Sequence, residues 1–479
     1  MSLRKQGISG VKWTSSATII TTLLQVLQVA ILARFLSASD FGLMAIVMVV
    51  IGFSQAFLDM GISNAIIHKQ YVTSRQLSTL YWVNILAGIG LYGIIYLLAP
   101  WIASFYHEAK LEDIVKLVGI IFLITPYGQQ FFVLLEKELQ FRTLAKISIL
   151  NKFISLLITT YLAYRGMGVY ALVYGAISSA VFTTVQYILI GIKNYKLSFT
   201  FDIYEVKEFV QFGLYQMGER TINYFNSQFD TILIGKFLGV ESLGVYTIAK
   251  ELVMRPAAVI NPVLTRVAFP TMAKIQNDIP RLKQLYIKML NFIATINFPI
   301  YIAMIILAPE LITIIFGDKW DRAIPLVQIL AIFGAIRSVV NPIGSLLLAR
   351  GRADLGFWWN FGLFFYVPLS IYIYSFWDLE GIAWGMVINI LILQLPSYYV
   401  LVKPLCGAGL KEYFWQILRP MLFSVIIYYI VNTFYFALCP NIFLKMLCVL
   451  GLIIVLSFIL NKFFNKVFMS ELRGFVKNE

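Results

Sequence analysis

The sequence is poor in the residues that build metal centres, disulfide frameworks and water-exposed surfaces. Its 479 residues include two histidines and three cysteines, with no CxxC pair. So few ligands support neither a metal cluster nor a disulfide framework, and redox chemistry is not expected. Charged residues make up only 13% of the chain, about half of the fraction that is usual in soluble domains. This composition excludes an ordinary soluble protein.

Apolar residues take the place of the missing charge. Hydrophobic residues account for 60% of the chain and aromatic residues for 15%, and the mean hydropathy is +0.81. These values are typical of a polytopic membrane protein. The net charge of +14 does not indicate nucleic acid, because lysine and arginine recur in short segments between apolar runs, which is the pattern that orients a membrane protein.

Apolar runs long enough to cross a bilayer recur along the chain and predict an all-α membrane protein with about 14 transmembrane helices. Lysine and arginine favour alternate connecting segments, which places both termini in the cytoplasm. The basic segment Met1–Lys12 leads into the first run without a cleavage site, so this run is expected to stay as a span. The predicted spans are 13–36, 41–67, 78–100, 114–135, 147–164, 168–192, 209–234, 243–265, 288–308, 323–349, 355–376, 381–402, 416–438 and 442–463.

A ten-residue motif occurs twice. Residues 34–43 (RFLSASDFGL) align without gaps with residues 236–245 (KFLGVESLGV), 202 positions later, and residues 168–172 resemble residues 381–385. We interpret these pairs as two copies of a six-helix unit in the same membrane orientation, which predicts two pseudo-symmetric lobes, a cavity between them and alternating access. The predicted parts are an N-terminal lobe (1–195), a C-terminal lobe (196–405), and two further helices with a cytoplasmic tail (406–479).

Ionisable and polar residues interrupt the spans that begin the second copy. In 209–234 they recur every three or four positions and form one stripe of a helix, and the first span carries a matching stripe of Thr14, Thr21 and Gln28. Charge at bilayer depth is costly unless it faces a partner or water, which predicts a cavity lining. Charge pairing that merely locks helices together is the alternative. The residues are Gln216, Glu219, Arg220, Asn223, Asn226 and Asp230 in the seventh span, and Lys250, Glu251 and Arg255 in the eighth.

Two more charges lie inside predicted spans, Asp59 in the second and Arg337 in the tenth. Arg337 is roughly 21 Å from the outer end of its helix at the usual helical rise. It must therefore meet water, an anionic ligand or a partner from another helix, with a salt bridge to an acid such as Glu251 as the structural alternative. Several prolines are expected to kink or break spans of the second half. They are Pro256, Pro262, Pro299, Pro325 and Pro342.

Seven short segments occur in an order that is specific as a set. They are 10–14 (GVKWT), 32–43 (LARFL and DFGL), 59–61 (DMG), 141–145 (FRTLA), 168–173 (GVYALV), 316–320 (FGDKW) and 348–355 (LARGRADL). Together they resemble the polysaccharide exporters of the multidrug/oligosaccharidyl-lipid/polysaccharide (MOP) flippase superfamily, in particular the colanic-acid and teichuronic-acid exporters. The resemblance covers about residues 3–405 and implies a MATE-like fold with a central cavity and two additional helices.

The resemblance implies a flippase that moves an undecaprenyl-pyrophosphate-linked glycan across the bacterial cytoplasmic (inner) membrane. Membrane lipids are implied as partners, other polysaccharide-assembly membrane proteins are left open, and nucleic acid is not expected. No catalytic residue, metal or cofactor is expected beyond a coupling Na⁺ or H⁺. The site residues come from the charge pattern rather than the resemblance: Arg220, Lys250, Arg255, Arg337, Asn223 and Asn226 for substrate, and Asp59, Glu219 and Asp230 for ion coupling.

Three other functions are alternatives to export. A drug or cation antiporter of the same superfamily favours an acidic cavity, whereas four deep cations here favour an anionic substrate. A polysaccharide polymerase or ligase needs a large outer loop with catalytic arginine or histidine, and neither His68 nor His107 has an obvious catalytic partner. A scaffold without transport stays open.

Overall fold

A computed structural model describes residues 3–58, 73–194, 202–435, 441–465 and 467–469. Side chains are described for these residues except 3–9, 11, 56–58, 194, 203–220, 263, 264, 266 and 267. Every element within the described residues is a helix. The chain divides into two compact units, residues 1–244 (unit 1) and 245–479 (unit 2). The lobe boundaries inferred from the repeat remain predictions.

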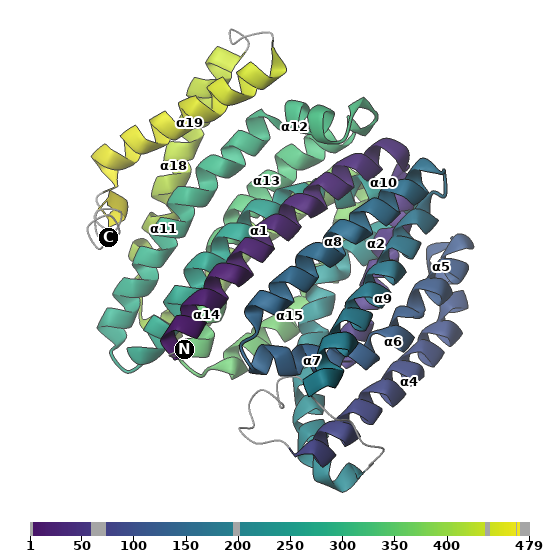
Figure 1. Ribbon diagram of the computed structural model, residues 1–479. Helices are drawn as coiled ribbons and strands as arrows, with labels where there is room; N and C mark the ends of the chain where they lie inside the picture. Colours follow the sequence, from purple (N-terminus) through teal and green to yellow (C-terminus); the bar gives the residue numbers. More distant parts are fainter. Residues whose placement is uncertain (1–2, 59–72, 195–201, 436–440, 466, 470–479) are drawn as a thin grey trace. The chain divides into compact units, whose positions relative to one another are not determined.

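Unit 1 is built from long helices that pack side by side. Helix α1 packs on α8, α8 packs on α9, and α4 packs on α5 (Figure 1). Helix α2 contacts α4, α5 and α9. The helices are α1 (Leu3–Phe35), α2 (Ala38–Leu58), α4 (Ser74–Tyr106), α5 (Lys110–Gly119), α6 (Ile121–Ile124), α7 (Pro126–Lys137), α8 (Phe141–Tyr164), α9 (Val169–Asn194) and the first part of α10 (Ile203–Lys274).

Unit 2 contains the rest of α10 and the remaining helices. Helix α11 packs on α13 and α18, α13 packs on α16, and α18 packs on α19. The elements are α11 (Ile279–Ile306), α12 (Ala308–Ile315), η1 (Asp318–Trp320), α13 (Ala323–Val340), α14 (Ile343–Ala349), α15 (Ala353–Tyr374), η2 (Ser375–Trp377), α16 (Asp378–Ser397), η3 (Tyr398–Val402), α17 (Lys403–Cys406), α18 (Leu410–Tyr435) and α19 (Ile442–Phe464).

The described residues contain 11 helical stretches long and apolar enough to span a membrane, or 12 when the bent pair Lys110–Ile124 and Pro126–Lys137 is one span. Two stretches, Thr221–Pro262 and Ala353–Cys406, have 42 and 54 residues, and each is long enough for two spans. Counting each of them twice raises 12 to the predicted number of 14. The break predicted at 235–242 is present but shorter than expected, because α10 departs from helical geometry at Gly239, where φ is 79° and ψ is 172°.

The two copies of the ten-residue motif pack against each other through reciprocal glycines. A Cβ on Gly42 would lie 1.8 Å from the carbonyl oxygen of Val240, and a Cβ on Gly244 would lie 1.8 Å from the carbonyl oxygen of Ala38. Gly244 and Val240 are the counterparts of Gly42 and Ala38 at the offset of 202. Each glycine therefore lets its helix approach the backbone of the other copy, so the two copies form a twofold-like contact.

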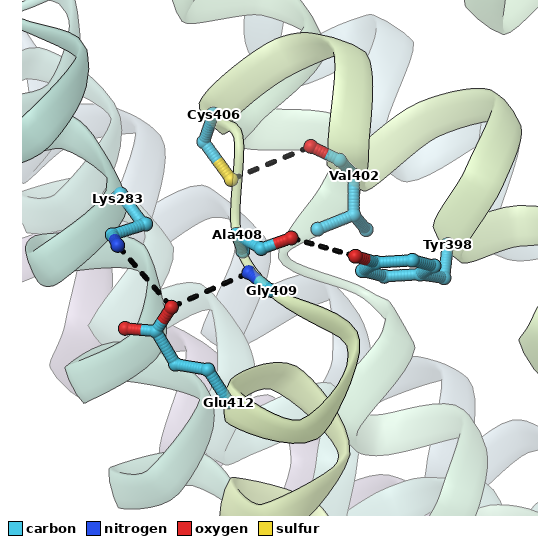
Figure 2. A network of polar contacts seen from close by, with 7 residues as sticks. All are labelled: Lys283, Tyr398, Val402, Cys406, Ala408, Gly409 and Glu412. Atoms are coloured by element: carbon cyan, nitrogen blue, oxygen red, sulfur yellow. Dashed lines mark hydrogen bonds and ion pairs between the residues drawn. The ribbon is translucent and has the colours of Figure 1, made fainter.

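The last two helices of unit 2 are held to the rest of that unit at both ends of α18. At its start, the Glu412 carboxylate forms an ion pair of 3.2 Å with the Lys283 amine and accepts a hydrogen bond of 3.3 Å from the Gly409 N–H, as Figure 2 shows. Near its end, Glu310 of α12 forms an ion pair of 3.0 Å with Lys445 of α19 and accepts a hydrogen bond from the Tyr435 hydroxyl. These contacts anchor the α18–α19 pair to the earlier helices of unit 2.

Candidate functional site

Several residues proposed for the site lie outside the part that the structure describes. Asp59 belongs to the segment 59–72, which is not described. Glu219 and Arg220 lie in α10, but their side chains are not described. Their roles in binding or coupling therefore remain predictions from the sequence.

The described part of the polar stripe runs from the surface into the packed interior of unit 1. Asn223 is exposed, Asn226 is partly buried, and Asp230 is buried at 6% exposure. The Asp230 carboxylate accepts hydrogen bonds from the Thr231 N–H (2.8 Å) and the Thr231 hydroxyl (3.4 Å). The stripe is thus a continuous polar face, and its buried end holds an acid.

The charges of the eighth predicted span lie close together on α10. Arg255 forms an ion pair with Glu251 one turn earlier, with side-chain exposures of 24% and 35%. The Lys250 amine lies 5.7 Å from the centre of the Tyr246 ring. This pair lies within one helix and so differs from the pairing between helices that the structural alternative supposed for Glu251, and both side chains retain solvent access.

Arg337 lies on the exposed side of α13, with its guanidinium 5.6 Å from the centre of the Phe333 ring. Among the described residues no acidic side chain forms an ion pair with it. Helix α13 is tied to α10 beside this position, because the Asn261 side-chain amide donates a hydrogen bond of 2.9 Å to the Ser338 carbonyl. The structure therefore packs the helix of Arg337 against the helix that carries Lys250 and Arg255.

The tenth predicted span breaks at Pro342, as the sequence predicts. Helix α13 ends at Val340 and α14 begins at Ile343. In a continuous helix the N–H of residue 342 would bond to the Ser338 carbonyl, but proline has no N–H. Asn261 supplies the missing donor to this carbonyl, and Asn297 in turn donates to the Asn261 side-chain oxygen at 3.4 Å.

Unit 1 contains a cavity of about 450 Å³ that the sequence did not predict. Its walls come from α1, α2, α8, α9 and the break between α6 and α7. Within the described part of the chain, no aspartate or glutamate lines it. The polar residues that line it are Gln28, Gln55, Thr125, Gln129, Lys152, Ser155, Thr159, Ser179, Thr183 and Thr184.

Lys152 is the cation of this cavity, and sequence reasoning missed it. It lies near the middle of α8, roughly 17 Å from either end at the usual helical rise. A lysine at that depth of an apolar span is a functional signal in itself. Of the cavity residues only Gln28 belonged to a pattern noted in the sequence, because the others are brought together by packing of five separate segments.

The break between α6 and α7 forms one wall of the cavity. The segments on either side of it meet at a bend of 50°, and Pro126 leaves the Phe122 carbonyl without its helical donor. Helix α4 packs onto this point through Gly88, where a Cβ would lie 2.3 Å from the Phe122 carbonyl oxygen and 2.6 Å from Pro126 Cγ. Non-helical backbone at membrane depth is tolerated where it is packed by protein or lines a cavity, and here both conditions hold.

Comparisons with known proteins agree with this architecture. Residues 31–325 match the sequence profile of a family described as "Polysaccharide biosynthesis protein". The chain is 36% identical over 431 residues to the teichuronic acid biosynthesis protein TuaB of Bacillus subtilis (strain 168), covering 88% of each. It is 32% identical over 429 residues to the lipopolysaccharide biosynthesis protein WzxC of Escherichia coli (strain K12), covering 89% of this chain and 87% of that protein.

Two solved structures have a similar fold. The structure of the lipid II flippase MurJ in an inward closed conformation has a TM-score of 0.77 at 14% identity, covering 95% of this chain and 98% of that chain. An inward-facing multidrug resistance MATE transporter of the MOP superfamily has a TM-score of 0.59 at 14% identity, covering 84% and 94%. At these identities the likeness concerns the fold alone.

Proposed function

This chain belongs to the polysaccharide biosynthesis protein family and is an exporter of the MOP flippase superfamily, and on that premise we propose that it translocates undecaprenyl-pyrophosphate-linked oligosaccharide repeat units. In this proposal the substrate moves from the cytoplasmic to the outer leaflet of the bacterial cytoplasmic membrane by alternating access, and both termini are cytoplasmic. The names of the relatives, which refer to teichuronic acid and lipopolysaccharide biosynthesis, support a glycan as the cargo.

The observation that carries the proposal is the environment of Arg337. Its guanidinium is exposed on an apolar helix, and no acid pairs with it among the described residues. A pyrophosphate is anionic and loses its hydration in hydrocarbon, and a planar guanidinium can replace that hydration with two parallel hydrogen bonds. We assign the pyrophosphate to Arg337 together with Arg220, Lys250 and Arg255, and the first sugars to Asn223 and Asn226.

The ion pair between Arg255 and Glu251 sets a condition on this assignment. Arg255 can bind a phosphate only when Glu251 releases it or shares it, because one guanidinium satisfies a limited number of acceptors. Substrate binding is therefore coupled to a change at Glu251. Such a change is a local switch of the kind that biases one transporter state over another.

Ion coupling is assigned to the acids Asp59, Glu219 and Asp230, of which Asp230 has a described side chain. The Asp230 carboxylate is buried, and an acid inside a membrane-spanning helix is a candidate for holding Na⁺ or a proton. Asp230→Asn should then remove the dependence of export on the ion gradient. If export by single Asn and Gln variants of all three acids kept its full gradient dependence, coupling through these residues would be wrong.

The main test uses a strain that lacks its own exporter and accumulates lipid-linked oligosaccharide in the inner leaflet. The full chain should restore surface glycan and clear the accumulated intermediate. At matched expression, Arg337→Ala should abolish both effects, Arg337→Lys should retain part of them because the charge remains, and the exposed control Arg281→Ala should be neutral.

Each competing function predicts a different result in the same strain. An antiporter would leave the intermediate stranded while changing drug resistance. A polymerase or ligase would alter glycan length or attachment without clearing the inner leaflet. Full complementation by Arg337→Ala would refute the phosphate-binding role of this residue.

A further inference from the structure

We propose that unit 1 carries a site for the phosphate headgroup of an anionic membrane phospholipid, formed by Arg142 and Lys146 of α8 with Trp13 of α1. The charge pattern of the sequence places this end of unit 1 at the cytoplasmic side of the membrane. The proposal goes beyond export, because it concerns a lipid that is held rather than carried. It starts from two segments that the candidate site does not use, residues 10–14 (GVKWT) and 141–145 (FRTLA).

The two segments meet near the starts of α1 and α8, which pack on each other (Figure 1). A Cβ on Gly10 would lie 2.5 Å from the Phe141 ring, so a larger residue at this position would push the helices apart. Three positions further along α1, the centre of the Trp13 ring lies 5.4 Å from the Arg142 guanidinium. Contacts from both segments therefore fix the position of one arginine.

Both contacts lie where apolar stretches begin. The stretches of α1 and α8 that are long and apolar enough to span a membrane are Lys12–Phe35 and Phe141–Tyr164. Trp13 and Arg142 are the second residues of these stretches, which places them at the boundary between hydrocarbon and water. Tryptophan is enriched at this boundary, and the polar headgroups of the lipids lie there.

The cations of the site keep their hydrogen-bond donors available. Arg142 and Lys146 are exposed, and within the described part of the chain neither forms an ion pair or a side-chain hydrogen bond. The nearest acid along the chain, Glu138, accepts a hydrogen bond of 2.8 Å from the Gln140 amide. An arginine over an aromatic ring keeps the N–H groups at the edge of its guanidinium, which can bind two oxygens of one phosphate.

The surface beyond the cations identifies the ligand as a lipid. Arg142 and Lys146 are one turn apart, and the same stripe of α8 continues at spacings of three or four. The residues that continue it are large, apolar and exposed: Leu150, Phe153 and Leu157. A molecule with a phosphate at one end and acyl chains at the other matches the whole stripe, whereas a soluble phosphate matches only its start.

Charge favours an anionic headgroup over a zwitterionic one. Lys12 precedes Trp13 and is also exposed, so three cations lie at the same level of the two helices. Each lysine or arginine near an anionic membrane surface adds to the attraction. Phosphatidylcholine cancels the charge of its phosphate with its own choline, so the site should prefer phosphatidylglycerol, which has a net negative charge.

Native mass spectrometry of the purified full chain, released from detergent micelles, tests the proposal by counting bound lipids during titration. The tightest site should bind dioleoyl phosphatidylglycerol about tenfold more tightly than dioleoyl phosphatidylcholine. Arg142→Gln should weaken phosphatidylglycerol binding about tenfold, as expected for one charge-assisted hydrogen-bonded pair, and Lys146→Gln should weaken it about fivefold. Arg142→Lys should lose less than Arg142→Gln, because the charge remains without the planar fork.

Trp13 is a positioning residue that acts through Arg142. Trp13→Leu should weaken phosphatidylglycerol binding in the parent protein and have no further effect in the Arg142→Gln background, whereas Trp13→Phe should keep most of the affinity because a ring remains. The matched control is Arg165→Gln, since Arg165 is exposed at the opposite end of α8. This control should leave the affinity unchanged.

Four results would overturn the proposal. Equal affinity for the two lipids would remove the preference, and phosphatidylglycerol binding unchanged by Arg142→Gln would remove the site. Displacement of phosphatidylglycerol by inorganic phosphate at constant ionic strength would show a site for a soluble anion. Much tighter binding of undecaprenyl pyrophosphate, with the same dependence on Arg142, would assign the site to a carried lipid. None of these measurements involves glycan export, so failure here leaves the proposed function standing.

Discussion

The two units each contain a span broken by proline, and they cover the resulting carbonyl in different ways. In unit 1, Pro126 frees the Phe122 carbonyl, and Gly88 brings a neighbouring helix directly onto it. In unit 2, Pro342 frees the Ser338 carbonyl, and the Asn261 side chain donates a hydrogen bond to it. One solution uses backbone packing and the other uses a polar side chain.

The difference shows that a helix break at proline can serve two structural purposes. Packing by glycine covers the break from one side only, and the other side borders the unit 1 cavity through Ile121 and Thr125. Covering by Asn261, which is itself held by Asn297, braces two helices against each other beside Arg337. A helix break can therefore form the wall of a cavity, or it can fix the position of a helix that carries a candidate functional side chain.

The largest effect should come from the reciprocal glycines, where the two copies of the motif meet. Gly42→Ala and Gly244→Ala each place a methyl group against a backbone carbonyl oxygen that lies 1.8 Å from the ideal Cβ position. Neither backbone can yield easily, so we expect each substitution to lower the free energy of unfolding by about 3 kcal/mol. Equal losses would support the twofold relation between the copies.

The controls for this experiment are Gly90→Ala and Gly93→Ala in α4, because an added Cβ at these glycines meets no atom within 4 Å. Thermal unfolding in detergent micelles measures all four variants. A loss at Gly42 with none at Gly244 would show that the contact is not shared symmetrically.

A smaller effect is expected where Asn261 covers the carbonyl freed by Pro342. Asn261→Leu leaves the buried Ser338 carbonyl without a donor, which should cost about 2 kcal/mol of stability. Pro342→Ala restores a backbone N–H that can take over this carbonyl, so Asn261→Leu should cost less in that background. A double-mutant cycle should give a coupling energy of about 1 kcal/mol, and additive losses would contradict the proposed exchange of donors.

The smallest effects concern two helical ion pairs of similar exposure, one in each unit. Glu112 pairs with Lys116 at 2.6 Å, and Glu251 pairs with Arg255. Partly exposed pairs of this spacing contribute little to stability, so Glu112→Gln and Glu251→Gln should barely change unfolding. Only Glu251→Gln should alter glycan export in the complementation strain, because it releases Arg255. An equal change in export from Glu112→Gln would remove this distinction between the pairs.

Much of the fold was predictable because membrane helices are specified by long apolar runs. The repeat at residues 34–43 and 236–245 also identified the segments that meet at Gly42 and Gly244. Helix ends were less predictable. The polar segment near Glu241 and Ser242 suggested a loop, yet a single positive φ at Gly239 accommodates the change of direction, and nothing in composition distinguishes these outcomes.

The sequence locates charges that interrupt an apolar run, as at Arg337, Lys250 and Arg255, and their role in binding stays a prediction. The same rule applied to Lys152 would have found it, since it lies within the span predicted at 147–164. The cavity around it was not predictable, because Gln28, Gln129 and Thr183 are each ordinary in a membrane helix. Only the packing of α1, α7, α8 and α9 brings them to one space.

The reciprocal glycine contact also has a consequence for folding during translation. Ala38 and Gly244 are 206 positions apart in the sequence, and a ribosome that adds about 5–20 residues per second takes roughly 10 to 40 s to cover that distance. Throughout this interval the first copy of the motif is already synthesised while its partner is still untranslated. The nascent chain must therefore hold the open face of α2 in the bilayer without its eventual neighbour, and completion of the first unit waits on translation of the start of the second copy.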